Sequence, residues 1–206
     1  MKRLLQAGSP ALRPGHGVES GLDPQLVRLL GHRNGFFAFE GALHVFPSGS
    51  EDDPNALQGW NSPSLWRDLY SGVERFTFFA EDAFGVQFAL TSSGLVTLEP
   101  ETGAVVPIAH GIEGWADALV DDWENLTGHP VARAWQLENR ALREGERLMP
   151  RVPFVLGGEF EVANLVAVDS VVGMRERGQL ASYLRGVPEG TQIDLAACGW
   201  TRHLAL

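Results

Sequence analysis

The chain has 206 residues, of which 44% are hydrophobic, and it carries a formal net charge of −10. This is enough apolar material for a substantial core, but no window approaches the roughly 18 consecutive apolar residues of a membrane span, and the apolar run after Met1 is too short for a signal peptide. Cys198 is the one cysteine, which excludes an intramolecular disulfide and every zinc site that needs two thiolates. We therefore expect a cytoplasmic protein in which Cys198 is a passive, small apolar residue.

The negative charge is concentrated in one part of the sequence. Residues 36–130 contain 15 Asp and Glu but only two Arg and no Lys, a formal charge of −13, and the remainder carries +3. An acidic field of this size repels nucleic acid and anionic membranes, and it accelerates the encounter with a basic protein. Acidic residues also keep an ordinary surface soluble, so composition leaves both interpretations open.

The first thirty residues predict an irregular segment followed by a helix. Residues 1–21 contain several Gly and Pro and no periodic pattern, so we expect a loose entry segment on the surface. Asp23-Pro24 then supplies a helix cap and a proline for the first turn, and leucines follow at helical spacing.

Between Asn34 and Pro47 the sequence predicts a pair of strands. Apolar residues alternate on both sides of Gly41, which indicates two strands joined by a tight turn or a bulge. His44 lies opposite the aliphatic face of its strand, where we expect a hydrogen-bonded structural residue rather than a ligand.

Residues 47–63 hold Gly, Pro and three consecutive acids, Glu51, Asp52 and Asp53. No regular element is expected there. Because three consecutive acids point in different directions on an extended chain, a mobile, solvated loop is a better interpretation than a metal site. A short helix is predicted over residues 65–70.

Residues 76–108 alternate between apolar-rich segments and turns. Strands are predicted over residues 76–80, 86–90, 95–98 and 104–108. Because the three connections are short and rich in turn residues, the pattern indicates an antiparallel meander. Pro107 places the last strand at an edge of the sheet or ends it.

The remainder predicts helices first and then a second set of strands. Apolar residues at spacings of three and four predict an amphipathic helix over residues 112–127, ended by Gly128, and a second helix over residues 131–147. Next we expect strands over 152–156, 159–162 and 165–168 with a Gly157-Gly158 hairpin turn, a helix capped by Asp169 and ending at Gly186, and a closing strand over 192–195. The expected fold is α+β, a curved antiparallel (mixed) sheet flanked by helices with a C-terminal strand–helix–strand extension.

The sequence contains no catalytic signature. It lacks a Gly-x-Ser-x-Gly elbow, a phosphate-binding loop and a Gly-x-Gly-x-x-Gly motif after a strand, and its six His are not spaced as a metal pair. Glu40, Glu81 and Asp82 form a carboxylate cluster if two turns meet in space, which is the minimum for acid–base work. We expect no enzyme activity, cofactor or metal, and we keep a metal-dependent hydrolase at that cluster as an alternative.

An ordered set of motifs carries a family resemblance. The motifs are Asn34-Gly35, Phe36-Phe37-Ala38-Phe39-Glu40, Leu43-His44-Val45-Phe46-Pro47, Trp66, Phe79-Ala80-Glu81-Asp82-Ala83-Phe84-Gly85-Val86-Gln87-Phe88 and Trp115. In this order they resemble the SMI1/KNR4 (SUKH) family over about residues 20–130. The resemblance implies one domain over residues 1–206, in which residues 131–206 resemble the C-terminal extension of a bacterial branch packed on the core.

The resemblance implies protein binding rather than catalysis. Bacterial members of this family are associated with immunity against polymorphic or contact-dependent toxins, many of them nucleases, and fungal members are regulatory scaffolds. We therefore expect an immunity protein that neutralises a basic toxin domain and binds neither nucleic acid nor membrane, with a regulatory scaffold as the alternative. The expected contact residues are Glu40, Trp60, Trp66, Glu81, Asp82 and Phe84, with Glu51, Asp52 and Asp53 steering the partner. For Trp66 and Phe84, a core position is the stronger expectation.

Overall fold

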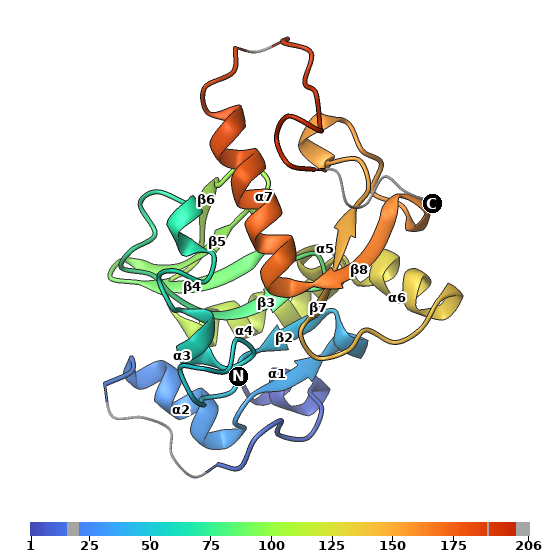
Figure 1. Cartoon of the computed structure of the whole chain (residues 1–206). Helices are drawn as coiled ribbons and strands as arrows, with labels where there is room; N and C mark the ends of the chain where they lie inside the picture. The colour runs from blue at the N-terminus through green and yellow to red at the C-terminus, as the bar shows by residue number, and fades with distance from the viewer. Residues whose placement is uncertain (16–20, 189, 201–206) are drawn as a thin grey trace.

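The structure is a computed structural model that describes residues 1–15, 21–188 and 190–200, and it confirms the predicted α+β class (Figure 1). A six-stranded antiparallel sheet has its strands in chain order, and a separate two-stranded antiparallel sheet pairs β7 with β8. The strands of the large sheet are β1 Phe36–Ala38, β2 Leu43–Val45, β3 Thr77–Asp82, β4 Gln87–Thr91, β5 Gly94–Leu98 and β6 Val105–Ala109. Those of the small sheet are β7 Glu146–Pro150 and β8 Leu165–Asp169.

The predicted strand pair and the predicted meander are both confirmed, and together they form the large sheet. β2 pairs with β3 so that His44 lies opposite Glu81 and Leu43 lies opposite Asp82. β6 is at the edge of the sheet, as Pro107 predicted, because proline has no N–H to donate to a further strand.

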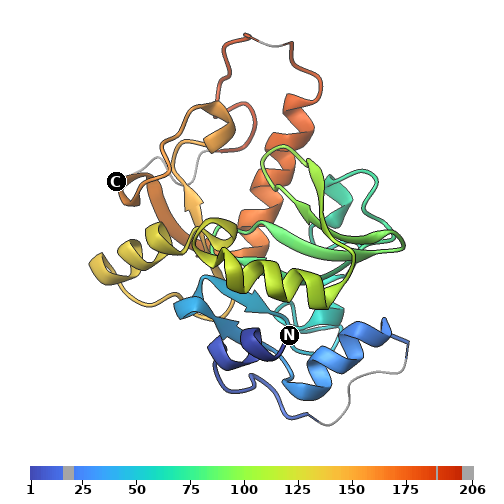
Figure 2. The ribbon, with the colours of Figure 1, turned by 180° about the vertical axis from the view of Figure 1, so that it is seen from behind.

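Aromatic side chains pack on both faces of the large sheet. The Phe79 ring lies 4.9 Å from that of Trp115 on α4 (Ile112–Asp121), whereas the Phe78 ring lies 4.9 Å from that of Trp66. Consecutive residues of a strand point to opposite faces. α4 therefore covers one face and α7 (Ser170–Leu184) covers the other, as the two opposite views show (Figures 1 and 2).

Two helices precede the sheet, where the sequence predicted one. α2 (Pro24–His32) is confirmed, with the Asp23 carboxylate accepting a hydrogen bond from the Gln25 amide at 2.8 Å. The expectation of an irregular entry segment was wrong for α1 (Lys2–Ala7), because six residues are too few to show a helical period. α1 buries Leu4 and packs against α4, so tertiary contacts stabilise it.

The region between β2 and β3 also differs from the prediction. α3 (Leu57–Trp60) lies in the stretch expected to hold no regular element, and the helix predicted over residues 65–70 is only a 3₁₀ turn, Arg67–Leu69. The Trp60 indole N–H donates to the Gln87 side-chain oxygen on β4 at 2.8 Å, and both side chains are buried. A contact with a distant strand, which local sequence does not reveal, therefore holds α3 in place.

The helix predicted over residues 112–127 is two helices, α4 and α5 (Trp123–Thr127), because the backbone breaks at Asp122. Gly128 ends α5 in the left-handed conformation, as predicted. α6 (His129–Glu138) stops well before residue 147, since the Asn139 side chain donates to the last-turn carbonyl of Trp135 at 2.9 Å and the chain then turns into β7.

The strands predicted after residue 150 are confirmed only for β8. Residues 152–156 and 159–162 form an irregular loop with two 3₁₀ turns, Phe154–Leu156 and Val162–Asn164, so the Gly157-Gly158 hairpin was wrong. The Asn164 side chain holds this loop by accepting from the Val152 amide and donating to its carbonyl. A polar side chain thus satisfies backbone groups that a strand would have paired.

The end of the described chain contains one confirmed element and one correction. α7 begins at the predicted cap, where the Asp169 carboxylate accepts from the Val172 amide at 3.0 Å. The closing strand over residues 192–195 was wrong, because this segment is irregular and leads into a turn that places Trp200 in a small apolar cluster with Cys198. Burial raises the pKa of the Cys198 thiol, which agrees with a passive apolar residue.

Candidate binding pocket

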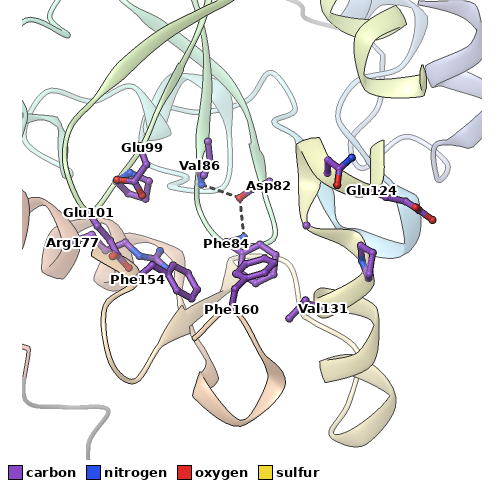
Figure 3. Close-up of a pocket in the computed structure, with 14 residues that line it drawn as sticks. Asp82, Phe84, Val86, Glu99, Glu101, Glu124, Val131, Phe154, Phe160 and Arg177 are labelled. Atoms are coloured by element: carbon purple, nitrogen blue, oxygen red, sulfur yellow. Dashed lines mark hydrogen bonds between the residues drawn. The ribbon is translucent and has the colours of Figure 1, made fainter. Parts of the chain in front are cut away.

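A pocket of about 290 Å³ lies where the large sheet meets α5, α6 and the C-terminal extension (Figure 3). The turn between β3 and β4, the turn between β5 and β6, the loop after β7 and α7 all contribute side chains to it. Its charged lining residues are Asp82, Glu99, Glu101, Glu124 and Arg177, and its aromatic ones are Phe84, Phe154 and Phe160. The two sheets are tied together beside the pocket, where the Leu148 amide donates to the Ala83 carbonyl at 2.7 Å.

Asp82 is the last residue of β3 and organises the turn that follows. Its Oδ1 accepts hydrogen bonds from the backbone amides of Phe84 at 2.8 Å and Val86 at 2.9 Å (Figure 3), a typical use of Asp at a turn. The side chain is buried, and burial raises the pKa of Asp82 to about 7, against the opposing effects of the two amides and of the Arg177 charge. Asp82 therefore titrates near neutral pH.

Glu101 lies in the turn between β5 and β6 and is 1% exposed. One carboxylate oxygen accepts from the Val155 amide at 2.9 Å, whereas the other, Oε1, is buried and has no hydrogen-bond partner in the described chain. Burial raises the pKa of Glu101 to about 7, although the Arg177 charge opposes it. The pocket thus holds two buried carboxyl groups whose pKa values burial raises, despite the Arg177 charge and hydrogen bonds from backbone amides.

Arg177 enters the pocket from α7 and is 2% exposed. Its Nη2 donates to the Leu148 carbonyl at 2.8 Å, and its Nε is buried without a hydrogen-bond partner among the described residues. The guanidinium fits closely against the turn after β3, because a Cβ on Gly85 would lie 2.7 Å from Nη1, and Gly85 has a φ of +81°. Glycine is therefore required at residue 85 both for the turn and for the passage of Arg177.

Three phenylalanines form the apolar side of the pocket. The Phe84 ring centroid lies 4.7 Å from that of Phe160, and Phe154 lies 5.4 Å from Phe160. Phe84 is buried, whereas Phe160 is 48% exposed. Gly128 makes this packing possible, since a Cβ there would lie 2.4 Å from a Phe84 ring carbon. An exposed aromatic side chain at the pocket's mouth is the kind of group that anchors a partner.

A second polar cluster, made of Glu81, Arg147, Gln87 and His44, lies beside the pocket, and its charged groups are paired with one another. Arg147 of β7 forms an ion pair with Glu81 at 2.7 Å, and the Gln87 side chain donates to the same carboxylate at 3.1 Å. His44 Nδ1 lies 3.4 Å from Glu81, so the expected structural role of this histidine is confirmed. Burial alone would raise the pKa of Glu81, but the Arg147 charge, followed by the His44 contact, lowers it below its usual value. Burial lowers the pKa of His44, so the ring is neutral at pH 7.

The structure brings two of the six expected contact residues to the pocket, Asp82 and Phe84. Trp60 and Trp66 are fully buried in the main hydrophobic core, so the expectation of a surface contact was wrong for both and a core position for Trp66 is confirmed. Glu81 is also buried, and its carboxylate is used by Arg147. The two tryptophans are buried because they are large apolar side chains. Glu81 is buried because the register between β2 and β3 places it opposite His44.

Glu40 is exposed and lies apart from the other two acids of the expected cluster. Its carboxylate lies 2.9 Å from His129 Nε2 and 3.2 Å from Arg133 Nε on α6, and the hydrogen bond from His129 lowers the pKa of Glu40. Phe39 and Glu40 both have left-handed φ angles, +52° and +55°, which turns Glu40 outward. The predicted cluster of Glu40, Glu81 and Asp82 is therefore not assembled.

The three steering acids differ in their surroundings. Glu51 and Asp52 are exposed and form no ion pair within the described ranges. Asp53 lies 3.4 Å from Arg13, which also pairs with Glu144 at 2.9 Å. Glu51 and Asp52 are thus the members of this run that present uncompensated charge.

Sequence reasoning missed Glu101 and Arg177. Glu101 was part of a turn, and Arg177 lies on α7 between the buried residues Met174 and Gly178. The available signal was an arginine on an otherwise buried helix face, because a buried arginine usually pairs with an acidic side chain or belongs to a binding site.

No set of three or more His, Cys, Asp or Glu side chains in the described part of the chain is arranged to hold a metal ion. The hydrolase alternative has therefore lost the carboxylate cluster that motivated it. None of the helices within the described ranges is both long and apolar enough to cross a membrane.

The comparisons with known proteins agree with the fold. The chain is similar to a solved structure, the crystal structure of Atu4351 from Agrobacterium tumefaciens, with a TM-score of 0.58 and 14% sequence identity over 86% of this chain and 88% of that chain. At this identity the similarity shows the α+β fold alone. No protein-family model matches the chain, and no curated protein matches it. The SMI1/KNR4 resemblance stays a prediction that rests on the sequence motifs.

Proposed function

We propose that this protein is a non-catalytic protein-binding module that recognises a basic protein, and that it acts in the cytoplasm as an immunity protein neutralising a toxin domain. The observation that carries the proposal is the pocket, where four carboxyl groups, two of them buried, and one guanidinium lie next to a half-exposed Phe160. A surface that combines uncompensated negative charge with an aromatic anchor is suited to cover a basic site on another protein.

The exposed acids outside the pocket support the same partner. They lie on α4, at the junction of α4 and α5, and in the loop after β2, and they are Glu51, Asp52, Glu113, Asp117, Asp121 and Asp122. Part of this charge is compensated, since the Met1 amino group lies 2.9 Å from Glu113 and Arg3 lies 2.8 Å from Asp121. The remaining charge acts over about 8–10 Å at physiological ionic strength and accelerates the approach of a basic protein. Glu40, beside the strained turn after β1, is a further contact residue in this proposal.

The experiment begins with tagged protein in its native cell and identifies the protein that copurifies. The purified partner is then tested in two ways, by its toxicity with and without this protein in a heterologous host, and by its association rate at increasing salt. We expect suppressed toxicity and an association rate that falls steeply with salt. A partner that is not toxic would replace the immunity proposal by a regulatory scaffold, and an association rate that ignores salt would overturn the basic-partner proposal.

A further inference from the structure

The strongest unexplained feature of the pocket is the unpartnered oxygen of Glu101. Glu101 is 1% exposed and lines the pocket (Figure 3), and its buried Oε1 has no hydrogen-bond partner in the described chain. A buried carboxylate oxygen without a donor is expensive, so each such group in a folded protein calls for an explanation. A ligand that donates a hydrogen bond from inside the pocket supplies one.

The charge around this oxygen indicates the sign of that ligand. Asp82, Glu99, Glu101 and Glu124 contribute four carboxyl groups, and Arg177 is the one basic residue among the lining residues that the structure describes. Arg177 forms no ion pair within 4.0 Å with a carboxylate of the described residues, its Nη2 donates to the Leu148 carbonyl, and its charge acts on Asp82 and Glu101 from a greater distance. The pocket therefore has an excess of negative charge and favours a cation.

The aromatic side of the pocket indicates that the cation is organic. Phe84 and Phe160 present rings 4.7 Å apart beside the carboxylates, and aromatic rings attract ammonium and guanidinium groups while packing against their alkyl stems. A hydrated metal ion gains nothing from such rings. A volume of about 290 Å³ is at the small end for ligand pockets, which fits one side chain or a small amine.

We infer that this pocket binds an alkylammonium or alkylguanidinium group, with the cationic head at Glu101 and Asp82 and the alkyl stem against Phe84 and Phe160. Two sources carry this chemistry, a Lys or Arg side chain of a protein partner and a free amine. The unpartnered Arg177 Nε favours the first source, since a basic residue also brings a peptide carbonyl that accepts from Nε. That the cation is a side chain of a protein partner rests on the proposed function, whereas the binding of an organic cation by this pocket does not.

The test uses the full chain and four small probes in a nuclear magnetic resonance titration. Nα-acetylarginine amide and Nα-acetyllysine amide represent a partner's side chain, n-butylguanidinium represents a free cation, and Nα-acetylnorleucine amide is the neutral control. The reporters are the amides of Val155, Phe84 and Val86, which donate to Glu101 and Asp82. We expect saturable shifts with a Kd on the order of 1 mM for the basic probes and at least about tenfold weaker binding of norleucine amide.

Two variants locate the site. Phe160→Ala removes a half-exposed ring and leaves the core intact, and Glu101→Gln keeps an oxygen for the Val155 amide. Each is expected to weaken binding of the arginine probe about tenfold, while Glu138→Gln, an exposed residue on α6, leaves binding unchanged. A circular dichroism melt of each variant confirms that it is folded, and Phe160→Ala keeps the test valid if Glu101→Gln does not fold.

The outcomes separate this inference from the proposed function. Tighter binding of the arginine or lysine amide than of n-butylguanidinium supports a protein side chain, and equal binding supports a free organic cation. Norleucine amide binding as well as arginine amide, or the absence of saturable shifts at about 50 mM probe, overturns the inference and leaves the basic-partner proposal to its own salt test. Probe binding by a protein whose isolated partner is not basic overturns the proposed function alone.

Discussion

Glu81 and Asp82 are neighbours on β3, both buried, yet they lie in opposite electrostatic environments. Glu81 has an ion pair with Arg147, and this charge lowers its pKa despite burial. Asp82 points into the pocket with two backbone amides and a more distant Arg177, and burial raises its pKa to about 7. The carboxylate with its own cation is structural, whereas the one that holds a turn without a paired cation is a candidate for contact with a ligand.

The largest expected effect on stability comes from breaking the ion pair between Arg147 and Glu81. Arg147→Met removes the cation and leaves Glu81 buried and unpaired, so we expect a loss of about 3–5 kcal/mol in the free energy of unfolding, measured by urea denaturation. Adding Glu81→Gln to this variant should recover part of the loss, because the unpaired charge is then removed. If Arg147→Met lowers the free energy of unfolding by no more than a surface substitution does, the ion pair does not stabilise this cluster.

The next largest effect on stability is expected at Gly128, which packs against Phe84 in the wall of the pocket. Gly128→Ala places a Cβ 2.4 Å from Phe84 in a residue with φ of +60°, so both steric overlap and backbone strain act, and we expect a loss of about 2–3 kcal/mol. Gly157→Ala is the matched control, since Gly157 has φ of +89° but no atom within 4 Å of the added Cβ. It should lose only about 1 kcal/mol. Equal losses by thermal denaturation would show that Phe84 moves aside freely.

Local patterns predicted the large sheet well and the pocket only in part. Alternation located β3 to β6, and two of the predicted contact residues, Asp82 and Phe84, line the pocket. Trp60 and α3 were misjudged because a side-chain bond to β4 decides their position. Glu101 and Arg177 come from a turn and a helix far apart in the sequence, and their meeting depends on how the extension packs, which no local period encodes.

The pH dependence of stability sharpens the comparison between Glu81 and the pocket. The pKa of Glu101 rises from 4.5 to about 7 on folding, so the folded protein holds the proton more tightly than the unfolded chain. Its contribution to stability is fully present below pH 4.5 and is lost as the pH rises through about 7. The Glu101→Gln variant has no such group, and between pH 5 and pH 8 it should lose about 1–2 kcal/mol less than the parent in urea denaturation. Identical pH profiles would mean that Glu101 stays ionised in the folded protein.

Ligand binding in the pocket should show the opposite pH dependence to that of stability. Protons compete with a cation for the carboxyl groups of Asp82 and Glu101, and the other charged residues that face the pocket are Glu99, Glu124 and Arg177. With the pKa values of Asp82 and Glu101 raised to about 7, the affinity for Nα-acetylarginine amide should fall about tenfold between pH 8 and pH 6 for each carboxylate that contacts the cation, in proportion to its ionised fraction. A constant affinity over this range would show that neither carboxylate contacts the cation.

The smallest effect on stability is expected at the exposed acids, which are neither buried in an ion pair, as Glu81 is, nor buried in the pocket, as Asp82 is. Glu51→Lys with Asp52→Lys changes two exposed residues that form no ion pair in the described chain, so the free energy of unfolding should change by no more than about 0.5 kcal/mol. The association rate with the basic partner should nevertheless fall several-fold at low salt and converge with that of the parent at high salt. Glu138→Lys on α6 is the control, because it reverses one exposed charge outside the acidic segment, and it is compared with the single variant Asp52→Lys. If both single variants slow association equally, net charge drives the encounter and the loop after β2 has no steering role of its own.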